Sequence, residues 1–167
     1  MRGGDAAIGR WAERIARESD DWPRHLHAYL QATWKVLSEQ RVPDFNTADL
    51  DAGMRAGALA REDYCRQRVG ASRTPLALLR ALHARIARDG PLDQEAARAT
   101  LREALKQATE SEREEWEERF GGRMQECYSQ LLRAGIVALD RDRRCDSPIP
   151  SLANHLLGEG VDSAQGP

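Results

Sequence analysis

The feature that most constrains the fold is one stripe of apolar and small residues between positions 116 and 138. Its members follow one another at intervals of three or four residues: Trp116, Phe120, Met124, Cys127, Leu131, Ala134 and Ala138. At about 100° per residue, they share one face of a helix. The stripe predicts one long helix from about Ser111 to Asp140. That helix would pass through Gly121-Gly122, although a glycine pair alone favours a break.

The rest of the chain repeats the amphipathic helical pattern without a comparable strand signal. Helices are expected over residues 5–17, 23–40, 47–69, 75–89, 93–108 and 151–157. Aromatic residues make up only 5% of the 167 residues, so leucine and alanine must fill most of the interior. The sequence therefore predicts an all-α, single-domain bundle of about five to seven amphipathic helices over residues 1–158. A disordered tail is expected over residues 159–167.

Two details of the expected packing depend on particular side chains. The second helix is expected to bury one stripe, formed by Leu26, Tyr29, Leu30, Trp34 and Leu37. The third helix carries Gly53 and Gly57, and small residues four apart allow two helices to approach closely. They are equally consistent with low helix propensity. The Gly53–Gly57 surface is one candidate contact of the Gly121-Gly122 pair, because small residues on both sides would let the backbones meet.

Composition restricts the partners and the compartment. The formal net charge is −2 and the pI is about 6.1, whereas proteins that neutralise many phosphates are usually basic, so no nucleic acid is expected. Apolar runs are only a few residues long and the N-terminus lacks an apolar signal region, so no membrane association is expected. Three widely spaced cysteines suit reduced thiols in a cytoplasmic protein.

No catalytic, cofactor or metal motif stands out, and we expect a protein that is not an enzyme. His25 and His27 are two residues apart, which points their rings away from each other on a helix, so they are expected at the surface without metal. Cys127 lies on the long stripe and should be buried and inert. Cys65 and Cys145 have arginine neighbours that would favour a thiolate, which gives a weak redox alternative. The glutamate-rich run 110–118 is expected to be a solvated face.

His83 is the polar residue of greatest interest, because it lies between Leu79 and Ile86 on an apolar stripe. A buried histidine must find a hydrogen-bond partner or stay neutral. The favoured interpretation is a hydrogen-bonded core histidine, and the alternative is a pH or ligand sensor. If the chain binds a small molecule, the candidate ligand pocket is formed by Trp34, Tyr64 and His83.

One region resembles a known family in three short stretches. They are Arg10-Trp11-Ala12-Glu13-Arg14-Ile15, the run Ala60-Arg61-Glu62-Asp63-Tyr64-Cys65-Arg66-Gln67-Arg68, and the leucine-rich run Pro75-Leu76-Ala77-Leu78-Leu79-Arg80-Ala81-Leu82-His83. Together they resemble the N-terminal helical, non-haem globin-like sensor domains of stressosome RsbR-type regulators. The resemblance covers less than half of the chain. It implies a bacterial, regulatory, non-catalytic helical module able to dimerise, and it identifies no site residues.

Three functions stay open at this point. The leading one is a non-enzymatic regulatory or protein-interaction domain that associates through helices, with a protein partner or a second copy. The second is a helical sensor domain that binds a small ligand. The third is a small helical subunit of a larger enzyme complex.

Overall fold

The computed structural model describes residues 2–19, 22–40 and 47–158, without the side chains of residues 2–7, 40 and 47. The structure is 79% helical, with eight helices and one two-stranded sheet in its described part. The predicted all-α class is therefore confirmed, and the number of helices is slightly higher than expected. The tail predicted over residues 159–167 lies outside the described residues.

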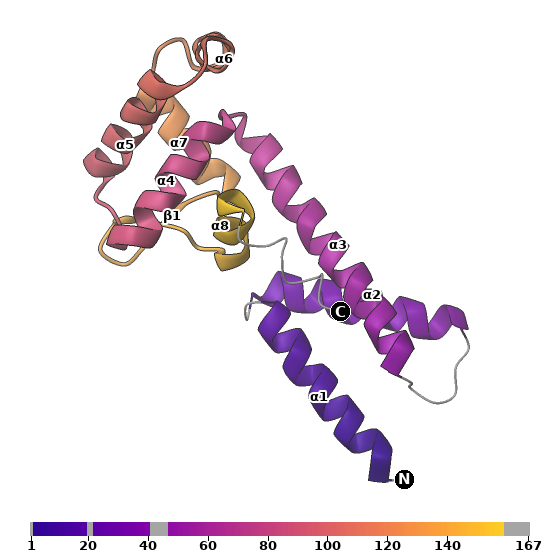
Figure 1. Ribbon diagram of the computed structural model, residues 1–167. Coiled ribbons are helices and arrows are strands. Elements are labelled where there is room, and N and C mark those ends of the chain that lie inside the picture. The colour runs from indigo at the N-terminus through magenta and orange to yellow at the C-terminus, as the bar shows by residue number, and fades with distance from the viewer. Residues whose placement is uncertain (1, 20–21, 41–46, 159–167) are drawn as a thin grey trace. The chain divides into compact units, whose positions relative to one another are not determined.

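The chain divides into two compact units, Met1–Tyr64 and Cys65–Pro167. The first unit contains α1 (Arg2–Glu18), α2 (Pro23–Gln40) and most of α3 (Thr47–Ser72), and the boundary falls inside α3. Figure 1 shows α3 as one continuous ribbon. The single domain expected over residues 1–158 stays a prediction.

In the first unit, α3 packs against α2 at the two glycines of α3. A Cβ atom on Gly57 would overlap the Tyr29 ring, and one on Gly53 would overlap Thr33. The glycines therefore allow close approach, as expected, and the helix that approaches them in this unit is α2. The candidate contact with Gly121-Gly122 stays a prediction. The face of α2 that is buried carries His25, Tyr29 and Thr33, four residues apart.

A small core and a polar network hold the helices of the first unit together. Ile15, Tyr29 and Met54 form the buried cluster, with Trp11 and Ala58 packed against it. At the C-terminal half of α1, the Arg14 guanidinium donates to Glu18 at 2.7 Å and to Asp51 of α3 at 2.6 Å. Arg61 of α3 also donates to the backbone carbonyl of Glu18. The partly exposed Arg14–Asp51 ion pair contributes little alone. Together with the Arg61 hydrogen bond, it connects α1 with α3.

The second unit holds the end of α3 and the remaining elements. They are α4 (Leu76–Asp89), α5 (Gln94–Gln107), α6 (Glu110–Phe120), α7 (Met124–Ala134), β1 (Ala138–Leu139), β2 (Cys145–Asp146) and α8 (Pro150–Leu157). Helix α4 packs against α5 and α8, and α5 packs against α7. The core is rich in leucine, as expected: Leu78, Leu79, Leu82, Leu101, Leu131, Leu152 and Leu156 are buried.

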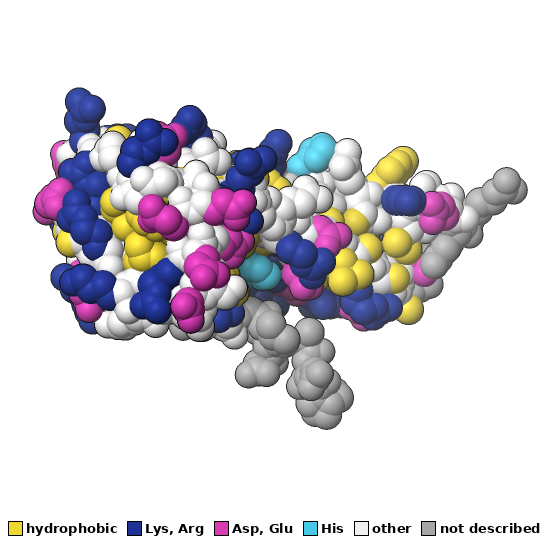
Figure 2. Space-filling view, turned by 90° about the horizontal axis from the view of Figure 1, so that it is seen from above, with side chains coloured by type: hydrophobic (Ala, Val, Ile, Leu, Met, Phe, Trp, Pro, Cys, Tyr) yellow, Lys and Arg dark blue, Asp and Glu magenta, His cyan; other side chains and the backbone are white. Residues whose placement is uncertain are grey.

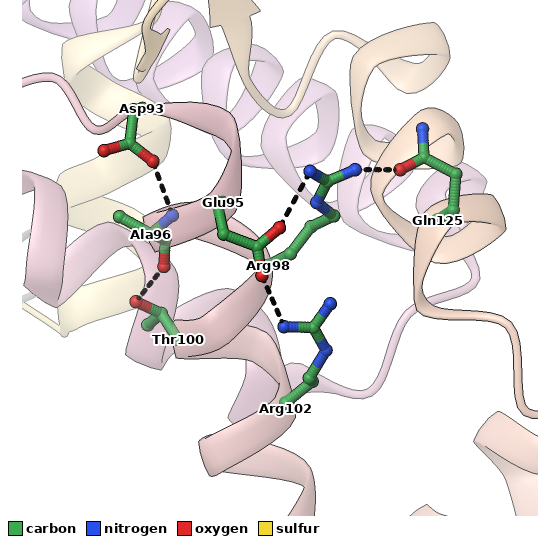
Figure 3. Close-up of polar contacts among 7 residues, drawn as sticks. All are labelled: Asp93, Glu95, Ala96, Arg98, Thr100, Arg102 and Gln125. Carbon is green, nitrogen blue, oxygen red and sulfur yellow. Dashed lines mark hydrogen bonds and ion pairs between the residues drawn. The ribbon is translucent and has the colours of Figure 1, made fainter.

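Polar contacts at the start of α5 cap this helix and connect it with α7 (Figure 3). The Asp93 carboxylate caps α5 by accepting from the backbone N–H of Ala96 at 2.7 Å. On the same helix, Glu95 accepts from Arg98 and Arg102 at 2.9 and 2.8 Å. Arg98 also donates to Gln125 of α7, so this network connects α5 with α7.

The long helix predicted through Gly121-Gly122 is wrong. Thr109 and Glu112 form a capping box that begins α6, and Gly121 ends it in the left-handed region with φ of 55°. Gly122 has φ of 73°, so the pair forms a turn before α7 begins at Met124. Because the turn is short, both helices direct the stripe into one core, and all its members from Trp116 to Leu131 are buried.

The predicted helix also ends earlier than Asp140. Gly135 closes α7 in the left-handed region, and the buried Ile136 and Val137 lead into an extended segment. Strand β1 then pairs antiparallel with β2, with Ala138 opposite Asp146 and Leu139 opposite Cys145. Leu92 adds two backbone hydrogen bonds to Cys145. This small sheet was missed because strands of two residues are too short to show alternation.

Candidate interaction surface

The structure places the three candidate pocket residues in different surroundings. Tyr64 packs at the start of α2, where its ring meets the His25 ring edge-on at 5.4 Å and the Arg24 guanidinium covers it at 5.4 Å. Trp34 lies nine residues beyond His25, or about 13 Å along α2. His83 belongs to the second unit. A pocket formed by the three residues stays a prediction.

His83 is buried in α4 with 1% of its surface exposed. Neither ring nitrogen has a hydrogen-bond partner among the described residues, so the hydrogen-bonded core histidine expected from the sequence is wrong. Burial disfavours the charged imidazolium and lowers the pKa of His83 from 6.5 to about 4. The side chain is therefore neutral at physiological pH, which was the other outcome allowed for a buried histidine.

The other histidines and the cysteines correct two expectations. His27 is exposed, but His25 is buried because it lies on the face of α2 that packs against α3. All three cysteines are buried, and none forms a disulfide. Burial raises the pKa of the Cys145 thiol to about 11, so its arginine neighbours do not produce a thiolate. Cys127 is buried on the stripe as predicted, and burial raises the pKa of its thiol too.

The glutamate-rich helix α6 exposes most of its carboxylates, which confirms the prediction of a solvated face. Glu112 is used in the capping box, and Glu115 pairs with Arg119 at 2.7 Å. Within the described ranges, no group of three or more histidine, cysteine, aspartate or glutamate side chains is arranged to hold a metal ion. None of the helices in the described part of the chain has the length and hydropathy needed to span a membrane.

The second unit has an open hollow of about 850 Å³ where α6, α7 and the end of α3 meet. Most of its lining is charged or polar, and two of these side chains hold the end of α3. Arg119 donates to the carbonyl of Arg73 at 2.9 Å, and Gln130 donates to the carbonyl of Ala71 at 3.1 Å. These groups are engaged in the fold, and none of the predicted pocket residues lines this hollow.

The most distinctive surface lies on α2. Leu26, Leu30 and Trp34, which we call the α2 ridge, expose 39%, 43% and 71% of their surface. They are four residues apart and form one row along the helix. The sequence prediction placed them in a buried stripe with Tyr29, and this is wrong for all three. The buried face of α2 is one position away, at His25, Tyr29 and Thr33, and the glycines of α3 were the signal that could have located it.

Further exposed apolar side chains belong to the same unit. Seven large hydrophobic side chains are exposed among the described residues, and five of them lie in the first unit. Besides the α2 ridge, these are Ile8 of α1 and Leu59 of α3. Figure 2 shows several hydrophobic side chains exposed over the helices of this unit. Clustered exposed apolar residues are typical of a surface that binds another molecule.

Comparison with known proteins yields no match: no family model, no curated protein and no solved structure is significantly similar to this chain. The resemblance to stressosome sensor domains therefore stays a prediction. The candidate function rests on the geometry of the first unit.

Proposed function

We propose that this protein is a non-enzymatic, helical regulatory module that binds a partner protein through the α2 ridge. The observation that carries the proposal is the exposure of Leu26, Leu30 and Trp34 in one row. Helix-mediated recognition uses such anchors at helical spacing, in a groove or along a face. Tryptophan is also among the residues that contribute most to binding when an interface excludes water from them.

The packing of the first unit favours a role of the α2 ridge in interaction over a role in the core of this unit. Tyr29, between Leu26 and Leu30 along the chain, is fully buried against α3, so α2 already has a packed face. The ridge is therefore additional apolar surface and not a misplaced core. Keeping a large tryptophan mostly in water has no benefit for folding, which favours a functional reason for it.

The same proposal places the protein in the cytoplasm. All three cysteines are buried, and none of them forms a disulfide. Cysteines that form no disulfide are typical of reducing compartments. The net charge of −2 also favours a protein partner over nucleic acid.

The test compares partner recovery by matched variants in cells that express the chain. Leu30→Ala and Trp34→Ala should lose the partner that the unaltered protein recovers. Leu139→Ala removes a similarly exposed apolar side chain from the second unit and should retain it. Circular dichroism should show that all variants remain folded. Equal recovery of the same partners by all variants would contradict the proposal.

A further inference from the structure

The α2 ridge is the centre of a longer apolar strip along α2. The strip has intervals of three, four, four and three residues, and its members are Pro23, Leu26, Leu30, Trp34 and Leu37. At about 100° per residue, all five lie within about 40° of Leu30 around the helix. Leu37 is partly buried and the other four are exposed. From Pro23 to Leu37 the strip extends over about 21 Å, or about four turns of helix.

The strip and its border carry no Lys, Arg, Asp or Glu side chain of α2. The residues next to it on the solvent side are polar and exposed: His27, Gln31 and Ser38. The charged residues of α2 are at about 120–180° around the helix from Leu30, and they are Arg24, Lys35 and Glu39. When this surface meets a copy of itself, these like charges therefore do not face one another. The surface also offers no charge pattern that would select a different protein.

The spacing of the strip is symmetric about Leu30. In a two-fold symmetric pair, the same surface is used on both sides. If two copies of α2 pack antiparallel with the axis at Leu30, residues equally far from Leu30 on its two sides face each other. Leu30 then meets its own copy, and Leu26 meets Trp34 of the other copy. Pro23 meets Leu37 in the same way, so every residue of the strip contacts an apolar side chain.

The sizes of the side chains favour an antiparallel pair over a parallel one. The antiparallel pair places the large Trp34 against the smaller Leu26 at both ends, and facing positions that combine large and small side chains interdigitate well. A parallel pair would instead place Trp34 against Trp34 and Leu26 against Leu26. The antiparallel direction also brings the helix ends of opposite partial charge together.

We propose, on the basis of the function proposed above, that the partner of the α2 ridge is a second copy of this chain, whose α2 packs antiparallel about a two-fold axis at Leu30. One face of a four-turn helix is smaller than the roughly 800 Å² per partner of a standard interface. The pair is therefore reversible. The chain is a folded monomer when dilute and a dimer when concentrated.

Sedimentation of the full chain over a range of concentrations tests for this pair. The mass should rise from the 18.7 kDa of one chain toward twice that value over about a thousandfold increase in concentration. Leu30→Ala and Trp34→Ala should each weaken association by about tenfold or more, because both side chains are central to the contact. The matched control is Leu59→Ala, which removes an exposed leucine of α3 and should leave association unchanged.

Charges placed at Leu30 distinguish loss of the interface from loss of folding. Because Leu30 meets its own copy, Leu30→Glu and Leu30→Lys should each prevent association through like charges at the axis. An equal mixture of the two variants should associate again, since opposite charges then face each other. A variant that had lost its fold would not be rescued in this way.

Cysteine substitutions test the direction of the pair. Under mild oxidation, a mixture of Leu26→Cys and Trp34→Cys chains should form a disulfide between the two. Leu26→Cys alone should not, because its two copies would be about 12 Å apart along the helices, beyond the roughly 7 Å that a disulfide spans between Cα atoms. The natural cysteines are all buried. Efficient cross-linking of Leu26→Cys alone would overturn the antiparallel pair.

The outcomes separate this inference from the proposed function. A monomer at every concentration, or association that Leu30→Glu leaves unchanged, would overturn the second copy as the partner. If Trp34→Ala still abolished recovery of a different protein from cells, the proposed function would survive that result. If neither self-association nor partner recovery responds to Trp34→Ala, both the inference and the proposed function fail.

Discussion

The two units of the molecule use their apolar residues differently. Among the described residues, the first unit buries four hydrophobic side chains, Ile15, Tyr29, Leu50 and Met54, and the second unit buries twenty-one. The exposed large hydrophobic side chains show the opposite distribution, with five in the first unit and two in the second. The second unit buries most of its large hydrophobic side chains in a core, and the first unit leaves most of its own exposed to solvent.

Under the function proposed above, this difference separates stability from recognition along the chain. The second unit has a layered core, capped helices and a small sheet that ties Leu92 to Cys145. The first unit depends on close helix contact at Gly53 and Gly57 and on ion pairs around Arg14. Small units bury a smaller share of their surface and are less stable, and binding surfaces are often drawn from the less stable parts of a protein.

The largest effect should come from the core of the second unit. Leu131→Ala removes a fully buried side chain from α7 and should lower the free energy of unfolding by roughly 2–5 kcal/mol, because it leaves a cavity. Leu59→Ala in α3 is the control, since that side chain is mostly exposed. An equal decrease in melting temperature for both variants would show that the two side chains are equally buried, which contradicts the contrast between the two units.

The next test concerns the helix contact that replaces a large core in the first unit. Gly57→Ala should destabilise by about 1–3 kcal/mol, because the new Cβ overlaps the Tyr29 ring. Gly70→Ala is matched in the same helix but meets no atom within 4 Å. It should stabilise by roughly 0.4–1 kcal/mol through the unfolded state. Urea titrations that show the same sign for both would mean that α2 and α3 are not in close contact.

His83 gives the second unit a pH dependence that no described residue of the first unit is shown to share. Its pKa is about 4 in the folded state and 6.5 in the unfolded chain, so the unfolded state binds the proton first as pH falls. Stability from this group is therefore complete above pH 6.5 and is lost between pH 6.5 and 4. From pH 7 to pH 5 the loss should be about 1–2 kcal/mol.

Substitution isolates this contribution from the carboxylates that titrate at lower pH. His83→Leu removes the titrating group and two buried nitrogens without partners, so its stability should fall less than that of the unaltered chain between pH 7 and pH 5. His27→Gln changes an exposed histidine of α2 and is the control for replacing a histidine. Parallel curves for His83→Leu and the unaltered chain would show that His83 already has a partner or is solvated.

The turn between α6 and α7 should respond with a smaller effect. Gly121→Ala places a Cβ in open space but at φ of 55°, and the left-handed conformation should cost about 1 kcal/mol. Gly121→Asn should cost less, because asparagine tolerates this conformation better. A gain in stability from Gly121→Ala, measured by thermal melting, would instead restore the continuous helix predicted from the stripe.

Local signals in the sequence located most of the helices. Pro23 begins α2, Asp93 begins α5 as its cap and Gly158 follows α8, in agreement with the expected ranges. Such residues act on the backbone within a few positions, so their effect can be predicted from the local sequence. A break between the helix over residues 93–108 and the helix from about Ser111 was also expected. Thr109 forms it, because Thr109 and Glu112 make the capping box that begins α6.

The expectations that failed depended on tertiary contacts. The stripe from Trp116 to Leu131 kept its phase across Gly121-Gly122, because two helices joined by a short turn can present one face to the same core. The buried side of α2 was misassigned because Leu26, Leu30 and Trp34 are more apolar than His25 and Thr33. Only the position of Gly53 and Gly57 on α3 explains why the polar pair is inside and the apolar ridge is outside.

The smallest expected effect on stability is that of Trp34→Ala, which tests whether the α2 ridge stabilises the fold. Trp34 exposes 71% of its surface, so Trp34→Ala should change the free energy of unfolding by less than about 0.5 kcal/mol. Trp116→Ala removes a tryptophan that is buried in the second unit and should cost about 3–5 kcal/mol. The two substitutions delete the same side chain, so the difference between their denaturation curves reports how strongly the surroundings of each tryptophan stabilise the fold. A loss of 2 kcal/mol or more for Trp34→Ala, on the order of a core substitution, would mean that the ridge stabilises the fold. The ridge would then be part of the core of the first unit, and the two units would no longer differ in how they use their apolar side chains.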